Sequence, residues 1–107
     1  MPKGIMIVES APASSDREDD FNKWYDETHL PQILAISGAS VGRRFRRIGE
    51  GRYPYIAIFE IEADDLEMTL SALGRALQSG ELEISPALGL DPAPTVTVYE
   101  LLNERSA

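Results

Sequence analysis

The chain has no cysteine and only one histidine, His29, and these two scarcities exclude several kinds of chemistry. Without cysteine there is no disulfide, no thiolate nucleophile, no iron–sulfur cluster and no zinc site built on sulfur. One histidine cannot form a three-histidine metal centre, so a metal would need mostly carboxylate ligands. We therefore expect no metal site, and a core that is stable without cross-links.

Positive charge and long apolar runs are also scarce. Ten basic residues face 18 acidic ones, which gives a formal net charge of −8. Such a surface repels phosphate, which argues against nucleic acid and anionic membrane as partners. No stretch approaches the ~20 apolar residues of a membrane helix, and the N-terminus lacks a charged segment followed by an apolar signal core. We expect a soluble, cytoplasmic protein.

The composition that remains is that of an ordinary globular domain. Hydrophobic residues make up 43% of the 107 residues and charged residues 26%. A chain of this length buries roughly 65% of its unfolded surface, which is enough for one core. Repeats, low-complexity tracts and linkers are missing from the sequence. The prediction is a single domain over residues 1–107.

Hydrophobic periodicity predicts two helices and four strands. Asp16 followed by Asp19 is typical of a helix N-terminus, and Pro31 should break that helix, with a short helical turn after it that closes at Gly38. The predicted strands span residues 4–9, 39–48, 53–62 and 95–102, and the predicted helices about 17–29 and 65–79. The second helix should bury Leu66, Leu70, Leu73 and Leu77. Residues 81–94, with three prolines, should form a loop.

This βαββαβ order is the ferredoxin-like arrangement, an α+β fold in which both helices cover one face of a four-stranded antiparallel sheet. The other face should be open. However, residues 5–8 and 55–61 are apolar at odd and even positions alike, whereas a strand with one wet face alternates. A second copy is the simplest cover, and two such sheets would form an eight-stranded barrel in a homodimer. The alternative is that residues 81–94 fold over the open face of a monomer.

Five arginines fall within ten positions and allow two interpretations. A guanidinium can hold a carboxylate or phosphate through two parallel hydrogen bonds, which would suit an anionic substrate. Solvated charges on an edge strand also prevent sheet-to-sheet aggregation, and we favour this second interpretation. The five residues are Arg43, Arg44, Arg46, Arg47 and Arg52.

The only tryptophan, Trp24, lies close to His29 and Pro31 in the sequence. At ~100° per residue, Phe21, Tyr25 and His29 form one helical stripe with Trp24 beside it. The imidazole should therefore emerge from an aromatic face. Whatever chemistry the protein performs is expected to pass through this stretch.

The candidate catalytic residues are His29, Tyr25 and Asp26. A histidine with an ordinary pKa near ~6.5 can accept and return a proton at neutral pH. This suits cyclisation, isomerisation, dehydration or decarboxylation of a carbonyl compound. Asp26 could orient the ring of His29 or raise its pKa, and Tyr25 could donate a hydrogen bond to a developing enolate oxygen. The alternative for His29 is a structural residue that caps the C-terminus of its helix.

The candidate substrate-binding residues are Trp24, Arg44 and Tyr55. Trp24 is expected to be core or cleft wall rather than a reactive group. Arg44 belongs to the arginine strand and is the candidate contact for an anionic group. Tyr55 is expected mainly to pack and to line part of the cleft.

The segment Phe21-Asn-Lys-Trp-Tyr-Asp-Glu-Thr-His-Leu-Pro31, followed by Gly38 and Arg43-Arg44-Phe45, resembles the EthD-like branch of the dimeric α+β barrel proteins. In layout the resemblance covers nearly the whole chain, but only the first helix and second strand are specific. It implies a cleft between helices and sheet in each subunit, with His29 pointing into it. Members of this superfamily include cofactor-free monooxygenases, polyketide cyclases, muconolactone isomerases and haem-dependent enzymes, and EthD proteins accompany an ether-degrading oxygenase.

Cofactors find little support in the sequence. His29 could be an axial ligand of haem, but few basic residues besides the arginine strand remain for the propionates. Gly49-Glu-Gly51 lies between strands, where a turn explains it, so no phosphate loop supports flavin or NAD. We expect no cofactor.

Two function classes remain after these exclusions. One is a cyclase, isomerase, dehydratase or decarboxylase acting on a hydrophobic carbonyl compound in a catabolic or secondary-metabolite pathway. The other is a non-catalytic binding or accessory dimer associated with an oxygenase system.

Overall fold

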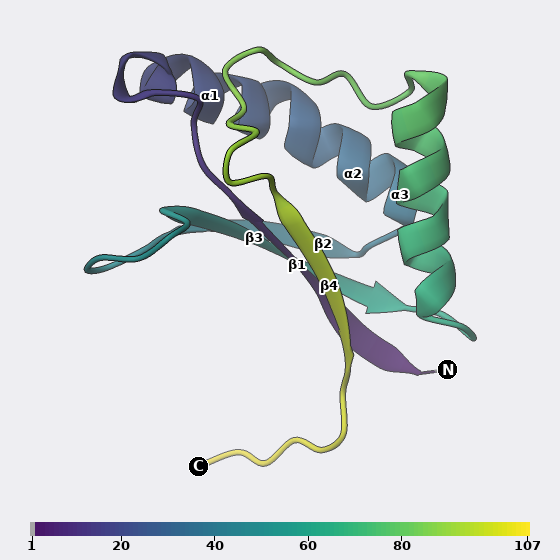
Figure 1. Cartoon of the computed structure of the whole chain (residues 1–107). Coiled ribbons are helices and arrows are strands. Elements are labelled where there is room, and N and C mark those ends of the chain that lie inside the picture. Colours follow the sequence, from purple (N-terminus) through teal and green to yellow (C-terminus); the bar gives the residue numbers. More distant parts are fainter. Residues whose placement is uncertain (1) are drawn as a thin grey trace.

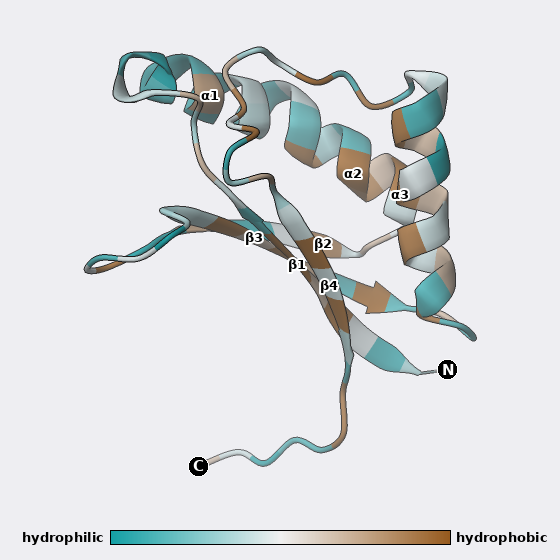
Figure 2. Ribbon diagram, viewed as in Figure 1, coloured by the Kyte–Doolittle hydropathy of each residue, from teal (hydrophilic) through white to brown (hydrophobic). Residues whose placement is uncertain are grey.

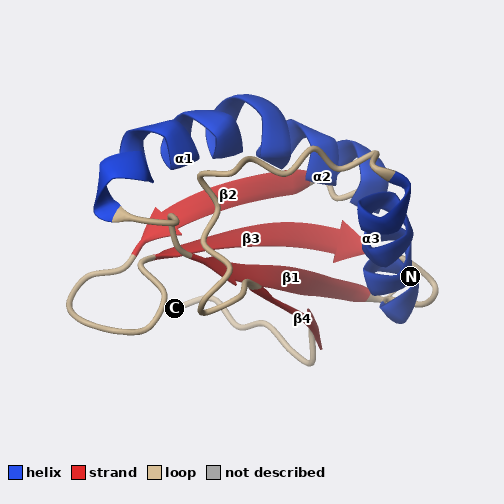
Figure 3. Ribbon diagram, turned by 45° about the horizontal axis from the view of Figure 1, so that its top comes forward, coloured by secondary structure: helices blue, strands red, loops and turns tan. Residues whose placement is uncertain are grey.

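Four antiparallel strands form one sheet, and the helices lie on one face of it (Figures 1 and 3). The computed structural model describes residues 2–107. The strands are β1 (Lys3–Ser10), β2 (Val41–Arg46), β3 (Tyr55–Glu62) and β4 (Thr95–Glu100), in the order β2-β3-β1-β4. The helical segments are η1 (Ser15–Arg17), α1 (Glu18–Trp24), η2 (Tyr25–His29), α2 (Leu30–Ser37) and α3 (Glu67–Ser79). The predicted ferredoxin-like α+β fold is confirmed.

The first helix does not break at Pro31, so this prediction was wrong. Segments α1, η2 and α2 form one continuous rod, because η2 is a π-helical turn in which the N–H of Leu30 bonds the carbonyl of Tyr25, five residues back. The wider turn accommodates a proline that clashes with a regular helix and lacks an N–H donor. The rod ends at Gly38, as predicted, because a φ of 70° there suits glycine.

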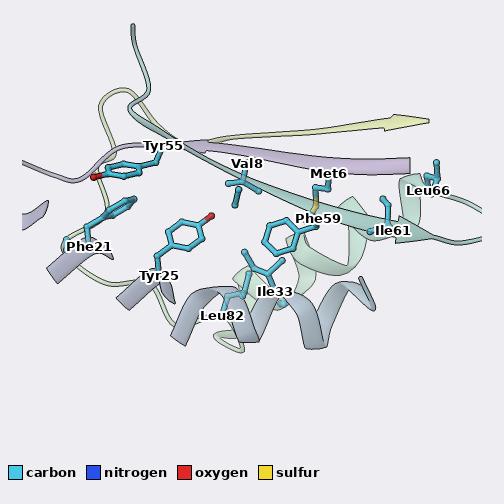
Figure 4. Close-up of a cluster of buried hydrophobic side chains, with 13 residues drawn as sticks. Met6, Val8, Phe21, Tyr25, Ile33, Tyr55, Phe59, Ile61, Leu66 and Leu82 are labelled. Atoms are coloured by element: carbon cyan, nitrogen blue, oxygen red, sulfur yellow. The ribbon is translucent and has the colours of Figure 1, made fainter. Parts of the chain in front are cut away.

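The hydrophobic core lies between the sheet and the rod. Alternate residues of β1 and β3 point toward the helices and are buried: Met6, Val8, Tyr55, Ala57, Phe59 and Ile61 (Figure 4). Figure 2 shows the hydrophobic residues concentrated on β1 and β3. Ile56 and Ile58 point to the other face, so this part of β3 is apolar on both faces, as the sequence indicates.

Helix α3 buries a narrower face than the sequence predicts. Leu66 and Ala76 are buried, but Leu70 and Leu77 are exposed. The reason is that α3 packs mainly against α2 and, on the sheet, mainly against β4. At its start the backbone N–H of Glu67 donates to Asp65 Oδ1 over 3.0 Å, so this carboxylate satisfies a free N–H of the first turn.

Residues 81–94 lie on the helix side of the sheet. Leu82 and Ala87 belong to the core, and the N–H of Ala13 donates to the carbonyl of Ala87 over 2.7 Å. The segment is a loop, as predicted, with one isolated bridge between Leu88 and Pro12. The alternative in which this segment covers the open face of a monomer was therefore wrong.

The face of the sheet away from the helices stays apolar and partly uncovered. Its central residues are half-buried and its flanks are exposed: Ile5, Ile7, Ile56 and Ile58 in the centre, with Phe45 and Tyr99 to the sides. In Figures 1 and 3 no helix lies on this side. Within residues 2–107, no helix is long and apolar enough to cross a membrane.

Candidate functional site

The imidazole of His29 is packed against the indole of Trp24. The two ring centroids are 4.4 Å apart and the planes are inclined by 24°. In a regular helix two residues five positions apart point in different directions, but the π-helical turn brings the fifth residue over the first. The site therefore depends on the helix distortion beside Pro31, and His29 is left only 7% exposed.

Tyr25 forms the second wall around His29. Its ring is 1% exposed and meets the imidazole edge-to-face, with 4.9 Å between centroids and 89° between planes. Figure 4 shows the Tyr25 hydroxyl pointing from the helix toward the sheet. The predicted contact between Tyr25 and His29 on one aromatic face is present.

Two buried polar atoms of this pair, Tyr25 Oη and His29 Nδ1, have no hydrogen-bond partner among the residues that the structure describes. An unpaired buried donor or acceptor costs about 1–3 kcal/mol, so such atoms are rare and each calls for an explanation. The phenol offers an O–H donor, and the imidazole offers one donor and one acceptor nitrogen. Together they can serve a polar group brought in by a ligand.

The protonation states of the pair follow from its burial. Burial lowers the pKa of His29 to about 4, and the positive charge of Arg44 acts in the same direction. Burial raises the pKa of Tyr25 to about 12, although Arg44 opposes this. At neutral pH the imidazole is neutral and the phenol is protonated. The prediction that Asp26 raises the pKa of His29 was wrong.

Asp26 is bonded to Arg44 instead of His29. Arg44 comes from β2, and its side chain is only 14% exposed. Its guanidinium donates to Asp26 Oδ1 over 2.7 Å and to Asn22 Oδ1 over 2.8 Å. The guanidinium carbon lies 4.5 Å from the centroid of the Tyr25 ring, a cation–π arrangement. Both arginines are thus occupied by the protein itself: Arg44 is largely buried, whereas Arg43 is exposed and pairs with Glu60 on the neighbouring strand.

Tyr55 ties the sheet to the start of the helical rod. Its hydroxyl donates to Glu18 Oε2 over 2.7 Å and accepts from Asn22 Nδ2 over 3.2 Å. The sequence analysis missed Glu18 and Asn22. The signal was present, because residues 18, 22 and 26 recur every four positions and so share one face of the helix. That face meets Arg44 and Tyr55.

Comparisons with known proteins support this architecture. No protein-family model matches the chain, and no curated protein matches it. Among solved structures, an ethyl tert-butyl ether D (EthD) family protein from Bacillus halodurans has a TM-score of 0.61 at 18% identity, over 95% of this chain and 100% of that one. An EthD-like protein from Ralstonia eutropha has a TM-score of 0.58 at 17% identity, over 99% and 98%. The chain has the EthD-like fold.

A third solved structure is also similar to this chain. HapK from Hahella chejuensis has a TM-score of 0.54 at 12% identity, over 96% of this chain and 97% of that one. At such identities the comparisons establish the EthD-like fold, while function has to be argued from the site.

Within this EthD-like fold, Trp24 also contacts the segment that follows α3. Its Nε1 donates to the carbonyl oxygen of Glu83 over 3.1 Å, and the N–H of Glu83 donates to Gln32 Oε1 over 3.0 Å. Both side chains come from the helical rod and hold the same residue of the segment. Sequence reasoning missed Gln32 and Glu83, and no local pattern marks them.

Three surface hollows occur among the described residues, and none of them is the cleft expected at His29. One of about 580 Å³ lies at the end of the sheet beside Ile5 and Tyr99, and one of about 600 Å³ lies between α3 and β4 beside Leu70 and Val98. A smaller one of about 160 Å³ lies beside the β2–β3 loop. His29 lines none of the three. No group of three or more potential metal ligands occurs within residues 2–107.

Proposed function

We propose that the chain is an EthD-like protein that acts on a hydrophobic carbonyl compound, with His29 as general acid and base and without a cofactor. The observation that carries the proposal is the pair of buried, unpaired polar atoms on the touching rings of Tyr25 and His29. Two adjacent groups with complementary hydrogen-bonding capacity and shifted pKa values are typical of acid–base sites. The reaction class is a lyase or isomerase step.

Each residue of the pair has one task in this reaction. His29 is neutral at neutral pH, because its pKa is about 4, and accepts a proton from the carbon next to the carbonyl group. The electron pair of that C–H bond becomes a C=C bond, the π pair of the carbonyl group moves to its oxygen, and the protonated Tyr25 donates a hydrogen bond to the resulting enolate. The imidazolium then returns the proton: to another carbon in an isomerisation, to the new alkoxide in a cyclisation, or to the departing β-hydroxyl, which leaves as water, in a dehydration. A decarboxylation forms the same enolate by loss of CO₂ and uses only the Tyr25 hydrogen bond, and solvent then supplies the proton to carbon.

The other predicted site residues support the pair. Asp26 positions Arg44, and the charge of Arg44 near the Tyr25 ring favours a developing negative charge on the ligand. Trp24 provides an apolar wall on the other side of His29. Tyr55 holds the start of the helical rod against the sheet through Glu18.

A second copy of the chain is the proposed cover of the open sheet face. That face keeps isoleucines half-buried in its centre, and residues 81–94 lie on the opposite side. Two sheets packed face to face would bury these residues in an eight-stranded barrel. Closed homodimers are the commonest soluble oligomers.

Deuterium exchange tests the proposed chemistry without knowledge of the product. Aromatic and aliphatic β-dicarbonyl compounds are incubated with the protein in D₂O, and loss of the α-proton signal is followed by NMR. The expected result is protein-dependent exchange of at least one compound. Ligands that raise the melting temperature without any exchange across the panel would contradict the acid–base role.

A second candidate is a non-catalytic ligand-binding or accessory dimer. The low exposure of His29 and its cover by Trp24 favour this candidate, because catalysis requires that a substrate reach the imidazole. The same panel separates the two. Binding that depends on Tyr25 without exchange supports the accessory role.

A further inference from the structure

Residues 83–86, which follow α3, meet the helical rod at Trp24 and Gln32, one before and one after His29 in the sequence. Within the described chain, two hydrogen bonds join this segment to the helical rod, and both use the main chain of Glu83. Glu83, Ile84 and Pro86 are exposed. Among the described residues, Glu83 is therefore the segment's only hydrogen-bonded link to the rod, while the half-buried Ser85 accepts from the N–H groups of Ala87 and Leu88 in the turn that follows.

Both flanks of the segment are fixed more firmly. On one side Leu82 is buried, and its N–H donates to the carbonyl of Ala76 over 3.2 Å. On the other side Ala87 is buried and accepts from Ala13, and the N–H of Gly89 donates to the carbonyl of Ala11 over 2.7 Å. A short exposed segment between two buried anchors can move without unfolding the domain.

The two partners of Glu83 stand on either side of His29 along the rod. Trp24 stacks on the imidazole, and Gln32, three residues after His29, lies on the same side of the helix. Because both bond Glu83, the main chain of Glu83 spans the position of His29. Nδ1 of His29 is buried, so a ligand can meet it only after something moves.

We propose that residues 83–86 form a lid over His29, and that Trp24 and Gln32 are the latch that holds it closed. The lid opens to admit the ligand to Tyr25 and His29. The nature of that ligand, a hydrophobic carbonyl compound, rests on the proposed function, whereas the lid itself rests on the contacts of Glu83. The latch makes Gln32 a residue that controls access without touching the reacting atoms.

The chain contains one histidine and one tryptophan, so His29 reports on the site and Trp24 on the latch without interference from a second residue of either type. Diethyl pyrocarbonate acylates neutral imidazole, and the mass of the modified peptide reports the reaction of His29 alone. Acrylamide quenching of fluorescence reports the exposure of Trp24. Loss of one hydrogen bond of about 1 kcal/mol raises the open fraction about fivefold.

The central variant is Gln32→Ala, which removes the acceptor for the Glu83 N–H. We expect His29 to react about fivefold faster than in the wild type, with stronger quenching of Trp24. Gln32→Glu keeps an acceptor oxygen and should react at the wild-type rate. Gln78→Ala, at an exposed position of α3, is the matched control and should also leave the rate unchanged.

Trp24→Phe provides a second test, because it keeps an aromatic ring against His29 and removes the N–H donor. If Gln32→Ala fails to fold by circular dichroism, this variant should still show the fivefold rise. Unchanged rates in the folded variants would overturn the lid. Faster acylation of His29 in the variants, with no deuterium exchange of any compound in the panel, would support the lid and contradict the proposed function. Deuterium exchange with unchanged acylation rates in the variants would support the proposed function and contradict the lid.

Discussion

The imidazole of His29 lies on the indole of Trp24, with 4.4 Å between the ring centroids, although the two residues are five positions apart in one helix. The π-helical turn between them makes this contact, and it ends next to Pro31. π-Helical turns are rare and concentrate at functional sites. Here the turn buries the imidazole between two aromatic rings and lowers its pKa.

Tyr25 and Tyr55, two of the three buried tyrosines, should respond oppositely to removal of their hydroxyl groups. Tyr25→Phe removes an oxygen without a partner, so we expect stability to stay unchanged or to rise by up to about 1 kcal/mol. Tyr55→Phe breaks bonds to Glu18 and Asn22 and should cost about 1 kcal/mol or more. Urea unfolding of both variants measures this. A clear loss of stability in Tyr25→Phe would mean that its hydroxyl has a structural partner.

The pair Arg43 and Arg44 tests whether the arginine strand has one role or two. Arg44→Lys gives up a two-pronged contact with Asp26 and Asn22 and the stacking on Tyr25, and should cost about 1–2 kcal/mol. Arg43→Lys alters an exposed pair with Glu60 and should stay within about 0.5 kcal/mol. The measurement is the free energy of unfolding. Equal losses would show that both arginines are ordinary edge-strand charges.

Stability should fall between pH 7 and pH 5 because of His29. Its pKa is about 4 in the folded protein and 6.5 without the fold, so the unfolded state binds the proton first as the pH falls. Stability is then lost from about pH 6.5 downward, by about 2 kcal/mol at pH 5. The free energy of unfolding, measured at both pH values, should fall in the wild type but not in His29→Gln. An equal fall in the variant would mean that carboxyl groups cause the loss of stability.

The open face of the sheet should control association. Ile58→Glu places a charge in the centre of that face and should change the mass in solution from a dimer to the 11.8 kDa of one chain. Leu77→Glu, at an exposed position of α3, should leave the dimer intact. Light scattering after size exclusion reads the mass. A wild type that is monomeric at all concentrations would contradict the proposed barrel.

The strands and the fold class could be predicted because their signals are local. The apolar run from Tyr55 to Ile61 marks a strand that is apolar on both faces, and Gly38 marks the end of a helix. The π-helical turn could not be predicted from a regular helical period, since one wide turn shifts every later residue. For that reason the sequence placed Trp24 beside the stripe of His29, whereas the two rings stack.

The partners of the site side chains depend on distant segments. Asp26 was expected to bond His29, its neighbour in the helix, but Arg44 on β2 offers two donors to Asp26 and Asn22. Trp24 likewise bonds Glu83, 59 residues later in the chain. Such contacts follow from tertiary packing, which overrides spacing along one helix. The sequence could name the aromatic and charged residues of the site without fixing their connections.

The role of His29 as the base is tested most directly by the rate of α-deuterium exchange on the best carbonyl ligand of the panel, compared between the wild type and its Tyr25→Phe and His29→Gln variants. We expect exchange to fall by about 100-fold or more in His29→Gln, which lacks the base, and by a smaller factor in Tyr25→Phe, which lacks the donor. Exchange at the wild-type rate in His29→Gln would show that another group removes the proton and that His29 is not the base.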